Sequence, residues 1–241
     1  MKGKDAGTGG KPRGGLHKER SAGTVSGAGP AGKGEPERAH SPARSAIVLV
    51  GGEGRRVNGL EKYFFRYQGE TFISRLVGNL HGLVDEIILV ARSPEQCSRF
   101  THFPDVRCTS DIRKGIGPVG GLHAGALEAS GEELFVTACD MPFVNPAVVR
   151  HLFSLLDGYD AVIPSWNSEM IEPLHAVYSR RAILSYFSEH STDSLRSMVR
   201  GLNVLYVDAG TLETIDPGLR TFININRLTD LQKINERRRE D

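Results

Sequence analysis

Short apolar runs alternate with segments of helical periodicity from residue 46 onward, and this alternation restricts the fold more than any other feature. The runs at 46–50 and 86–91 are mostly aliphatic, as is typical of strands buried on both faces. Between them, Phe72, Leu76 and Leu80 recur at steps of four, which indicates a helix with one apolar face. Repeated strand–helix units predict an α/β, Rossmann-like three-layer domain with a mainly parallel sheet.

The same pattern places the elements along the chain. It predicts strands at 46–50, 86–91, 106–109, 134–137, 161–164, 174–178, 203–207 and 222–226. It predicts helices at 72–80, 94–100, 117–129, 146–156, 181–187, 195–200 and from 228 to about 237. The order becomes less regular after residue 172, and we therefore expect one domain at 45–241 with an elaborated second half.

Residues 1–44 have a different composition from the rest. They carry nine Lys or Arg against four Asp or Glu, and they hold 11 of the 28 glycines but few aliphatic residues. Such a segment buries too little apolar surface to offset the entropy of ordering it, so we expect a disordered, basic, glycine-rich tail. Loose binding of a polyanion and no binding role both stay open for it, with the second favoured.

The sequence also restricts where the protein works. The tail lacks the apolar core of a signal peptide, and no apolar run is long enough to span a membrane. Cys97, Cys108 and Cys139 have no metal-ligand spacing, and we expect them to be reduced thiols of an intracellular, cytoplasmic protein. We expect no membrane partner and no specific nucleic-acid partner.

The first apolar run leads into a glycine-rich stretch that ends at Lys62. Gly51 and Gly52 lack a Cβ atom, so the backbone can approach an anion and point its N–H groups at it. Arg56 and Lys62 supply positive charge for a triphosphate. The stretch fits neither the dinucleotide-binding fingerprint nor the Walker motif, which predicts a nucleotide loop of another kind.

Other polar residues follow later strands, whose carboxyl ends meet at one edge of the sheet. Asp140 ends an apolar strand and suits Mg²⁺, which binds carboxylates, phosphates and water; it lies too early to cap the helix at Pro146. Asp111 could accept hydrogen bonds from ribose hydroxyls or guanine N–H groups, or it could form a turn. The helix that begins after Gly117 offers free N–H groups to an anion, although its small residues could equally serve close packing.

No nucleophilic triad can be argued, and no second catalytic carboxylate pairs with Asp140. That absence suits an acceptor that is already a phosphate monoester, because its second pKa is about 6 and it is largely dianionic at neutral pH. Such a nucleophile needs positioning and charge neutralisation rather than a strong base. The residues therefore favour nucleotidyl transfer.

Several motifs together resemble a known family. The pattern formed by Leu49, Gly51, Gly52, Arg56, Gly59 and Lys62 is similar to the signature of nucleotidyltransferases of the glycosyltransferase-A-like fold. The segments 117–121 (GPVGG), 139–142 (CDMP), 172–178 (EPLHAVY) and 222–226 (FININ) resemble those of molybdenum cofactor guanylyltransferases. The resemblance extends from about residue 46 to 236. The first motif is shared by many nucleotidyltransferases, whereas the combined set is more specific.

The resemblance implies transfer of GMP from GTP to molybdopterin with release of pyrophosphate, and Mg²⁺ as cofactor. It assigns catalysis to Arg56, Lys62 and Asp140, with the metal on Asp140. GTP binding falls to Leu49, Val50, Gly51, Gly52, Lys62, Asp111, Gly117 and Asp140, and the molybdopterin side to His175, Asn224 and Asn226. It also allows transient contact with proteins that insert molybdenum or receive the cofactor. Considered by itself, His175 is more often a structural residue than a functional one.

The sequence departs from the family at Val50, where alanine is usual, at Val57 and Asn58, and at Val90, where some members use an asparagine to contact the nucleotide. Sister enzymes on the same scaffold, such as cobinamide-phosphate guanylyltransferase or molybdopterin cytidylyltransferase, share the loop motif and are the first alternatives, although the segments 172–178 and 222–226 favour molybdopterin. A nucleotide-binding module without turnover and a polyanion-binding protein are more distant ones.

Overall fold

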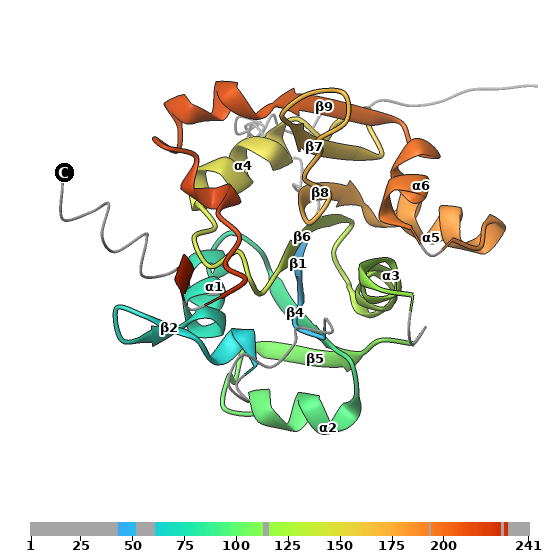
Figure 1. The fold of residues 1–241 in the computed structure, drawn as a ribbon. Helices are drawn as coiled ribbons and strands as arrows, with labels where there is room; N and C mark the ends of the chain where they lie inside the picture. The colour runs from blue at the N-terminus through green and yellow to red at the C-terminus, as the bar shows by residue number, and fades with distance from the viewer. Residues whose placement is uncertain (1–42, 52–60, 113–115, 193, 228, 231–241) are drawn as a thin grey trace, which may run out of the picture. The chain divides into compact units, whose positions relative to one another are not determined.

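The computed structural model describes residues 43–51, 61–112, 116–192, 194–227 and 229–230. Its centre is a seven-stranded sheet in the order β5-β4-β1-β6-β8-β7-β9 (Figure 1). The strands are β1 (Arg44–Leu49), β4 (Glu86–Ala91), β5 (Val106–Ser110), β6 (Glu133–Ala138), β7 (Ala161–Ser165), β8 (His175–Ser179) and β9 (Val204–Asp208). Neighbouring strands are parallel except at β8, which is antiparallel to β6 and β7. The predicted α/β fold with a mainly parallel sheet is confirmed.

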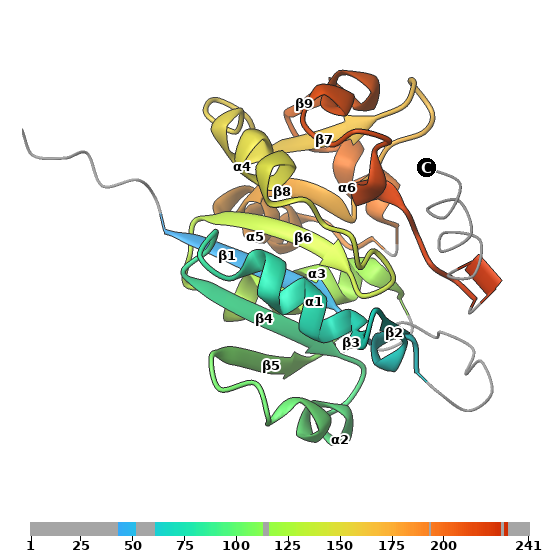
Figure 2. The same ribbon diagram turned by 90° about the vertical axis from the view of Figure 1, so that its left-hand side faces the viewer.

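Helices cover both faces of this sheet. They are α1 (Phe72–Leu80), α2 (Pro94–Cys97), α3 (Pro118–Glu128), α4 (Pro146–Ser154), α5 (Arg180–Glu189) and α6 (Leu195–Arg200). Short 3-10 turns occur at η1 (Lys62–Phe64), η2 (Ser98–Phe100), η3 (Ala209–Thr214) and η4 (Arg220–Phe222). Figures 1 and 2 show α1 and α4 on one face and α3, α5 and α6 on the other.

The two faces follow from the alternation of side chains along each strand. In β1, Ala46 and Val48 belong to the core cluster that includes α1 and α4. Ile47 and Leu49 belong to the cluster that includes α3, α5 and α6. Helix α3 can pack closely on β1 because Gly125 has no Cβ atom. A Cβ atom at this position would lie only 2.6 Å from a methyl carbon of Ile47. The small residues of α3 therefore serve packing at this position.

One predicted feature at the carboxyl end differs from the structure. The predicted strand at 222–226 is absent: Arg220–Phe222 forms η4, and 223–226 has no regular secondary structure. The apolar alternation there arises because Ile223 and Ile225 pack on an aromatic cluster with Phe143. A ladder does not form; the backbone of this segment meets the end of β6 through the N–H of Ile225, which donates to the carbonyl of Asp140 at 2.7 Å. Of the predicted last helix, only 229 and 230 are described, and both are helical.

A small hairpin was not predicted. Strands β2 (Arg66–Tyr67) and β3 (Glu70–Thr71) pair antiparallel immediately before α1. The turn between them places Gln68 at φ +53° and Gly69 at φ +86°. Gln-Gly is a weak signal for such a turn compared with Asn-Gly or Asp-Gly, and the two-residue strands are too short to show alternation.

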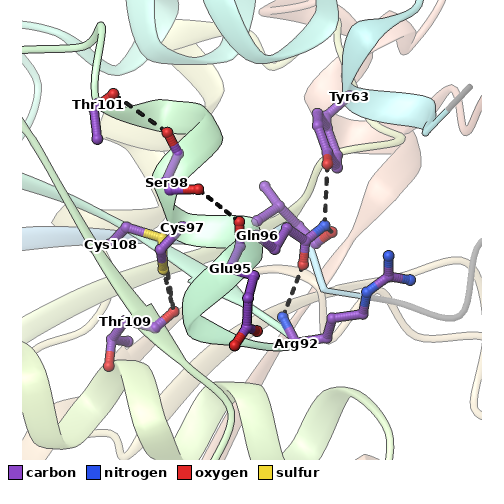
Figure 3. Close-up of a disulfide and its surroundings, with 10 residues drawn as sticks. Tyr63, Arg92, Glu95, Gln96, Cys97, Ser98, Thr101, Cys108 and Thr109 are labelled. Carbon is purple, nitrogen blue, oxygen red and sulfur yellow. Dashed lines mark hydrogen bonds between the residues drawn. A yellow bond between two sulfur atoms is a disulfide. The ribbon is translucent and has the colours of Figure 1, made fainter.

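The expectation of three reduced cysteines is wrong for two of them. Cys97, the last residue of α2, forms a disulfide with Cys108 of β5, with 5.6 Å between their Cα atoms (Figure 3). The turn between α2 and β5 brings the two residues together although 11 positions separate them in sequence. Cys139 is a free, buried thiol.

Two further expectations concern the tail at residues 1–44 and membrane-spanning segments. The predicted tail lies outside the described residues except for Ala43 and Arg44, and Arg44 already belongs to β1. In the part of the chain that the structure describes, no helix is long and apolar enough to cross a membrane.

Candidate functional site

A cavity of about 790 Å³ lies where the carboxyl ends of β1, β4 and β6 meet. Its volume is in the range of small-molecule sites. Most of the predicted site residues that the structure describes line it: Leu49, Val50, Gly51, Lys62, Asp111, Gly117, Asp140 and Asn224. Gly52 and Arg56 lie outside the described residues. The sheet therefore brings together residues from the ends of three strands, β1, β5 and β6, as the strand order predicts.

Two of the residues that line the cavity form an ion pair. Lys62, at the start of η1, places Nζ 3.2 Å from Oδ2 of Asp140, and the same ammonium donates to Oδ1 of Asn226 at 2.6 Å. The side chains of Lys62 and Asp140 are 18% and 19% exposed. Opposite charges that are mostly shielded from water interact more strongly than an exposed pair. This pair therefore fixes one cationic and one anionic group in the cavity.

A buried network supports the segment that carries the two asparagines. His175, at the start of β8, is fully buried, and its Nε2 lies 3.0 Å from Oγ1 of Thr221. Asp216 accepts from the backbone N–H of Thr221 at 2.7 Å. Burial lowers the pKa of His175 to about 3, so the imidazole is neutral at physiological pH. His175 does not line the cavity, in contrast to Asn224; it holds the 221–226 segment in place.

The glycine loop leaves β1 very close to the end of β4. The N–H of Val50 donates to the carbonyl of Val90 at 3.0 Å. A Cβ atom at Gly51 would lie 2.5 Å from the backbone nitrogen of Arg92 and 2.8 Å from the carbonyl carbon of Ala91. Those atoms are backbone and cannot move aside cheaply, so this position requires glycine. Because Gly51 has no side chain, the chain after β1 can lie against the end of β4, in the wall of the cavity.

A buried polar network forms the wall beside β4. The carboxylate of Glu61, 9% exposed as a residue, accepts from Nη2 of Arg92 at 2.7 Å and from Arg99 and the hydroxyl of Tyr63. Gln96 accepts from the N–H of Arg92 at 2.9 Å and donates to Tyr63 at 3.2 Å (Figure 3). Burial and the neighbouring carboxylate raise the pKa of Tyr63. These contacts join η1, the end of β4 and α2 to one another.

Two more predicted residues complete this side of the cavity. Asp111 follows β5, and its N–H donates to the carbonyl of Ala91 at 2.8 Å, which anchors the residue beside the end of β4. Gly117 caps α3 with φ +71°, a conformation that favours glycine. Gly117, Pro118 and Gly121 all line the cavity, so the first turn of α3 faces it.

The opposite wall comes from the second half of the chain. Glu172, Pro173 and Leu174 precede β8, and Leu195 begins α6; all four line the cavity. Oε1 of Glu172 accepts from the indole nitrogen of Trp166 at 2.8 Å. Burial raises the pKa of Glu172, and the indole hydrogen bond opposes that effect.

The arrangement suits positioning of anions better than covalent chemistry. Cys139 lies beside Asp140, but burial, assisted by the negative charge of Asp140, raises its pKa to about 12, so it is not a thiolate nucleophile. Within the described ranges, no cluster of three or more His, Cys, Asp or Glu could hold a metal ion. A metal at Asp140 would therefore need further ligands of other kinds, such as an amide oxygen, phosphates or water, as Mg²⁺ commonly has.

Sequence reasoning did not identify Glu61, Tyr63, Gln96 or Leu195 as site residues. Glu61 precedes Lys62 and looks like an ordinary surface residue, because its partners Arg92 and Arg99 lie 31 and 38 positions away. No local signal could have found that network. Glu172 differs from these four, because it belongs to the segment 172–178 that the family resemblance singled out.

Comparison with known proteins agrees with this architecture. Residues 46–206 match the family described as MobA-like NTP transferase domain. The chain is 40% identical over 213 residues to a protein of Methanosarcina acetivorans named probable molybdenum cofactor guanylyltransferase, covering 84% of this chain and 95% of that one. It is 33% identical over 195 residues to the molybdenum cofactor guanylyltransferase of Desulfosudis oleivorans, covering 79% and 94%.

A solved structure has the same fold. The molybdopterin-guanine dinucleotide biosynthesis protein A of Archaeoglobus fulgidus superposes with a TM-score of 0.67 at 29% identity, covering 82% of this chain and 100% of that one. A nucleotidyl transferase from Methanothermobacter superposes with a TM-score of 0.66 at 22% identity, over 83% of this chain and 100% of that one, which shows the fold alone.

Proposed function

This chain belongs to the MobA-like NTP transferase family, and we propose that it transfers GMP from GTP to the phosphate of molybdopterin. One observation carries the proposal. A single cavity joins a glycine-loop wall to a second wall before β8, and the Lys62–Asp140 pair lies between the two walls. That arrangement suits two phosphorylated substrates that react at its centre.

In the proposed reaction, a phosphate oxygen of molybdopterin attacks the α-phosphorus of GTP. The new P–O bond forms as the bond between the α-phosphorus and the bridging oxygen breaks, and pyrophosphate leaves. Lys62 neutralises charge on the reacting phosphates as a point charge, and Gly51 lets the backbone approach them. The attacking oxygen is already ionised, so the residues need to orient it and not to deprotonate it.

We propose Mg²⁺ as the cofactor, held by Asp140. The donor chemistry fits, because Asp140 and Asn226 present a carboxylate and an amide oxygen to the same cation, the ammonium of Lys62. Hard oxygen donors of this kind are those that Mg²⁺ binds. When bound, the ion would neutralise negative charge on the phosphates.

Asp111 is the proposed reader of the nucleoside. It lines the cavity at the end of β5, on the side of the sheet away from β8. Guanine presents N1–H and N2–H donors that a carboxylate can accept, whereas adenine and cytosine do not present this pair. Asp111→Ala should therefore raise KM for GTP more than it lowers kcat.

The test is incubation of the full chain with molybdopterin, Mg²⁺ and GTP, ATP or CTP, followed by mass measurement of the pterin product. We expect product with GTP, and we expect Asp140→Asn, which keeps size but removes charge, to lose at least about a hundredfold in kcat/KM. Asp157→Asn, between α4 and β7 and away from the cavity, is the matched control. Equal use of CTP, or transfer only to a phosphate that carries no pterin, would assign the chain to a sister activity.

A further inference from the structure

We infer that Glu172 recognises the pterin of the acceptor by accepting hydrogen bonds from its N3–H and 2-amino groups. This inference rests on the proposed function and identifies the residue that reads the second substrate. It starts from the fact that Glu172 is a partly buried carboxylate in the wall of the cavity.

The position of Glu172 is held by its own chain. Its N–H donates to the carbonyl of Pro164 at 2.8 Å, and its carbonyl accepts from the N–H of His175 at 3.0 Å. Both partners belong to strands of the sheet, β7 and β8. The backbone on either side of the carboxylate is therefore fixed before a ligand binds.

The carboxylate itself is also oriented. Oε1 accepts from Nε1 of Trp166 at 2.8 Å, and the indole ring packs edge-on against Phe222 at 5.5 Å between centroids. Among the described residues, Trp166 is the hydrogen-bond partner found for this carboxylate. An ionised carboxylate accepts about four hydrogen bonds, so capacity remains for two donors of a ligand. Trp166 acts as a positioning residue.

The loop that carries Trp166 has a defined shape. Trp166 donates from its N–H to the carbonyl of Met170 at 2.8 Å, and Oδ1 of Asn167 accepts from the N–H groups of Glu169 and Met170 at 2.9 and 2.8 Å. From α6, Arg196 donates to the carbonyl of Glu169 at 3.0 Å. Glu172 therefore sits at the base of a braced hairpin.

The arrangement of the two walls suits the chemistry of the two substrates. Guanine and pterin share a 2-amino-4-oxopyrimidine ring, with the same pair of adjacent N–H donors. The cavity offers one carboxylate after β5, Asp111, and another before β8, Glu172, with Lys62 and Asp140 between them. Four strand spacings, about 19 Å, separate β5 from β8. A two-headed product with phosphates in its middle matches this order of groups.

Steady-state kinetics with molybdopterin and GTP will test the inference. Glu172→Gln should raise KM for molybdopterin about tenfold or more and leave KM for GTP within about twofold, because an amide cannot accept both donors. Trp166→Phe keeps an aromatic ring but removes the indole N–H, and it should raise KM for molybdopterin by a smaller factor. Glu169→Gln, exposed on the same hairpin, is the control and should change neither constant.

A second measurement separates this inference from the proposed activity. 6-Hydroxymethylpterin phosphate is fluorescent, and its equilibrium binding can be measured without GTP. Binding of the pterin phosphate that weakens in Glu172→Gln but not in Glu169→Gln supports the inference. This holds even if the wild type forms no dinucleotide, because that result would refute only the proposed activity. Turnover of molybdopterin with an unchanged KM in Glu172→Gln, or an equal rise in KM for GTP, would overturn the inference alone.

Discussion

Replacing Glu86 by glutamine should destabilise the domain without touching the site. Glu86 is the first residue of β4, at the amino-terminal end of the strand, whereas the cavity lies at the carboxyl ends. Its Oε1 accepts from Oγ of Ser45 at 2.6 Å and from N and Oγ of Ser130 at 2.6 and 2.8 Å. Its Oε2 accepts from Nη1 of Arg107 at 2.9 Å. Burial alone raises the pKa of this carboxyl, but the hydrogen bonds outweigh it and lower the pKa from 4.5 to about 2.

The magnitude follows from that difference. At about 1.4 kcal/mol for each pKa unit, lowering the pKa from 4.5 to about 2 corresponds to roughly 3.5 kcal/mol of stability. The side chain of Glu86 is 15% exposed and that of Arg107 is 52% exposed, so solvent screening reduces the expected effect to about 1.5–3 kcal/mol. Because the folded state has the lower pKa, this stability is present above pH 4.5 and is lost as the pH falls toward 2.

Urea unfolding of the wild type and Glu86→Gln from pH 7 down to pH 3 measures the effect. We expect the free energies of unfolding to differ by about 1.5–3 kcal/mol at pH 7 and the gap to shrink by about half near pH 3. Glu189→Gln, exposed at the end of α5, should change stability by less than about 0.5 kcal/mol at any pH. Transferase activity of Glu86→Gln at pH 7 should match the wild type. A gap that stays constant with pH would refute the assignment to this charge.

Four further outcomes are expected. Gly51→Ala should lower GTP affinity at least tenfold, because the new Cβ meets backbone at 2.5 Å, whereas Gly78→Ala, with open space in α1, should stabilise by about 0.5–1 kcal/mol. Lys62→Met should raise KM for GTP about tenfold by kinetic assay. Cys97→Ser should lower the free energy of unfolding by about 2–3 kcal/mol. Removal of residues 1–40 should change kcat/KM by less than about twofold.

Much of the fold could be predicted because the strands are buried on both faces. The bounds of β4 and α1, Glu86–Ala91 and Phe72–Leu80, agree with the sequence prediction, since each apolar pattern ends at turn-forming or polar residues. The same reasoning failed at 222–226, where Ile223 and Ile225 alternate in a strand-like pattern. A periodicity of two shows which side chains are buried, but it does not show whether a partner strand is available.

The site was predictable where residues follow parallel strands, and not where contacts are distant. Asp111 comes directly after β5 and Asp140 comes two residues after β6, so topology alone places them at one edge. Gln96 reaches the carbonyl of Val50, 46 positions away, and Glu61 binds partners from two other elements. Such contacts depend on how α2 and η1 pack against each other. The sequence carries no local pattern for that packing.

The reversed direction of β8 has a consequence for how this scaffold diversifies. At the ends of β1, β5 and β6, the wall that we propose for the nucleotide is formed by chain that leaves a strand toward the helical layers. The wall that we propose for the acceptor includes a hairpin between β7 and β8, and both ends of that hairpin are held in the sheet. The hairpin meets the helical layer through the hydrogen bond that Arg196 of α6 donates to the carbonyl of Glu169. Under this assignment, exchanges in the hairpin would alter the site of the acceptor and leave the wall for the donor nucleotide unchanged.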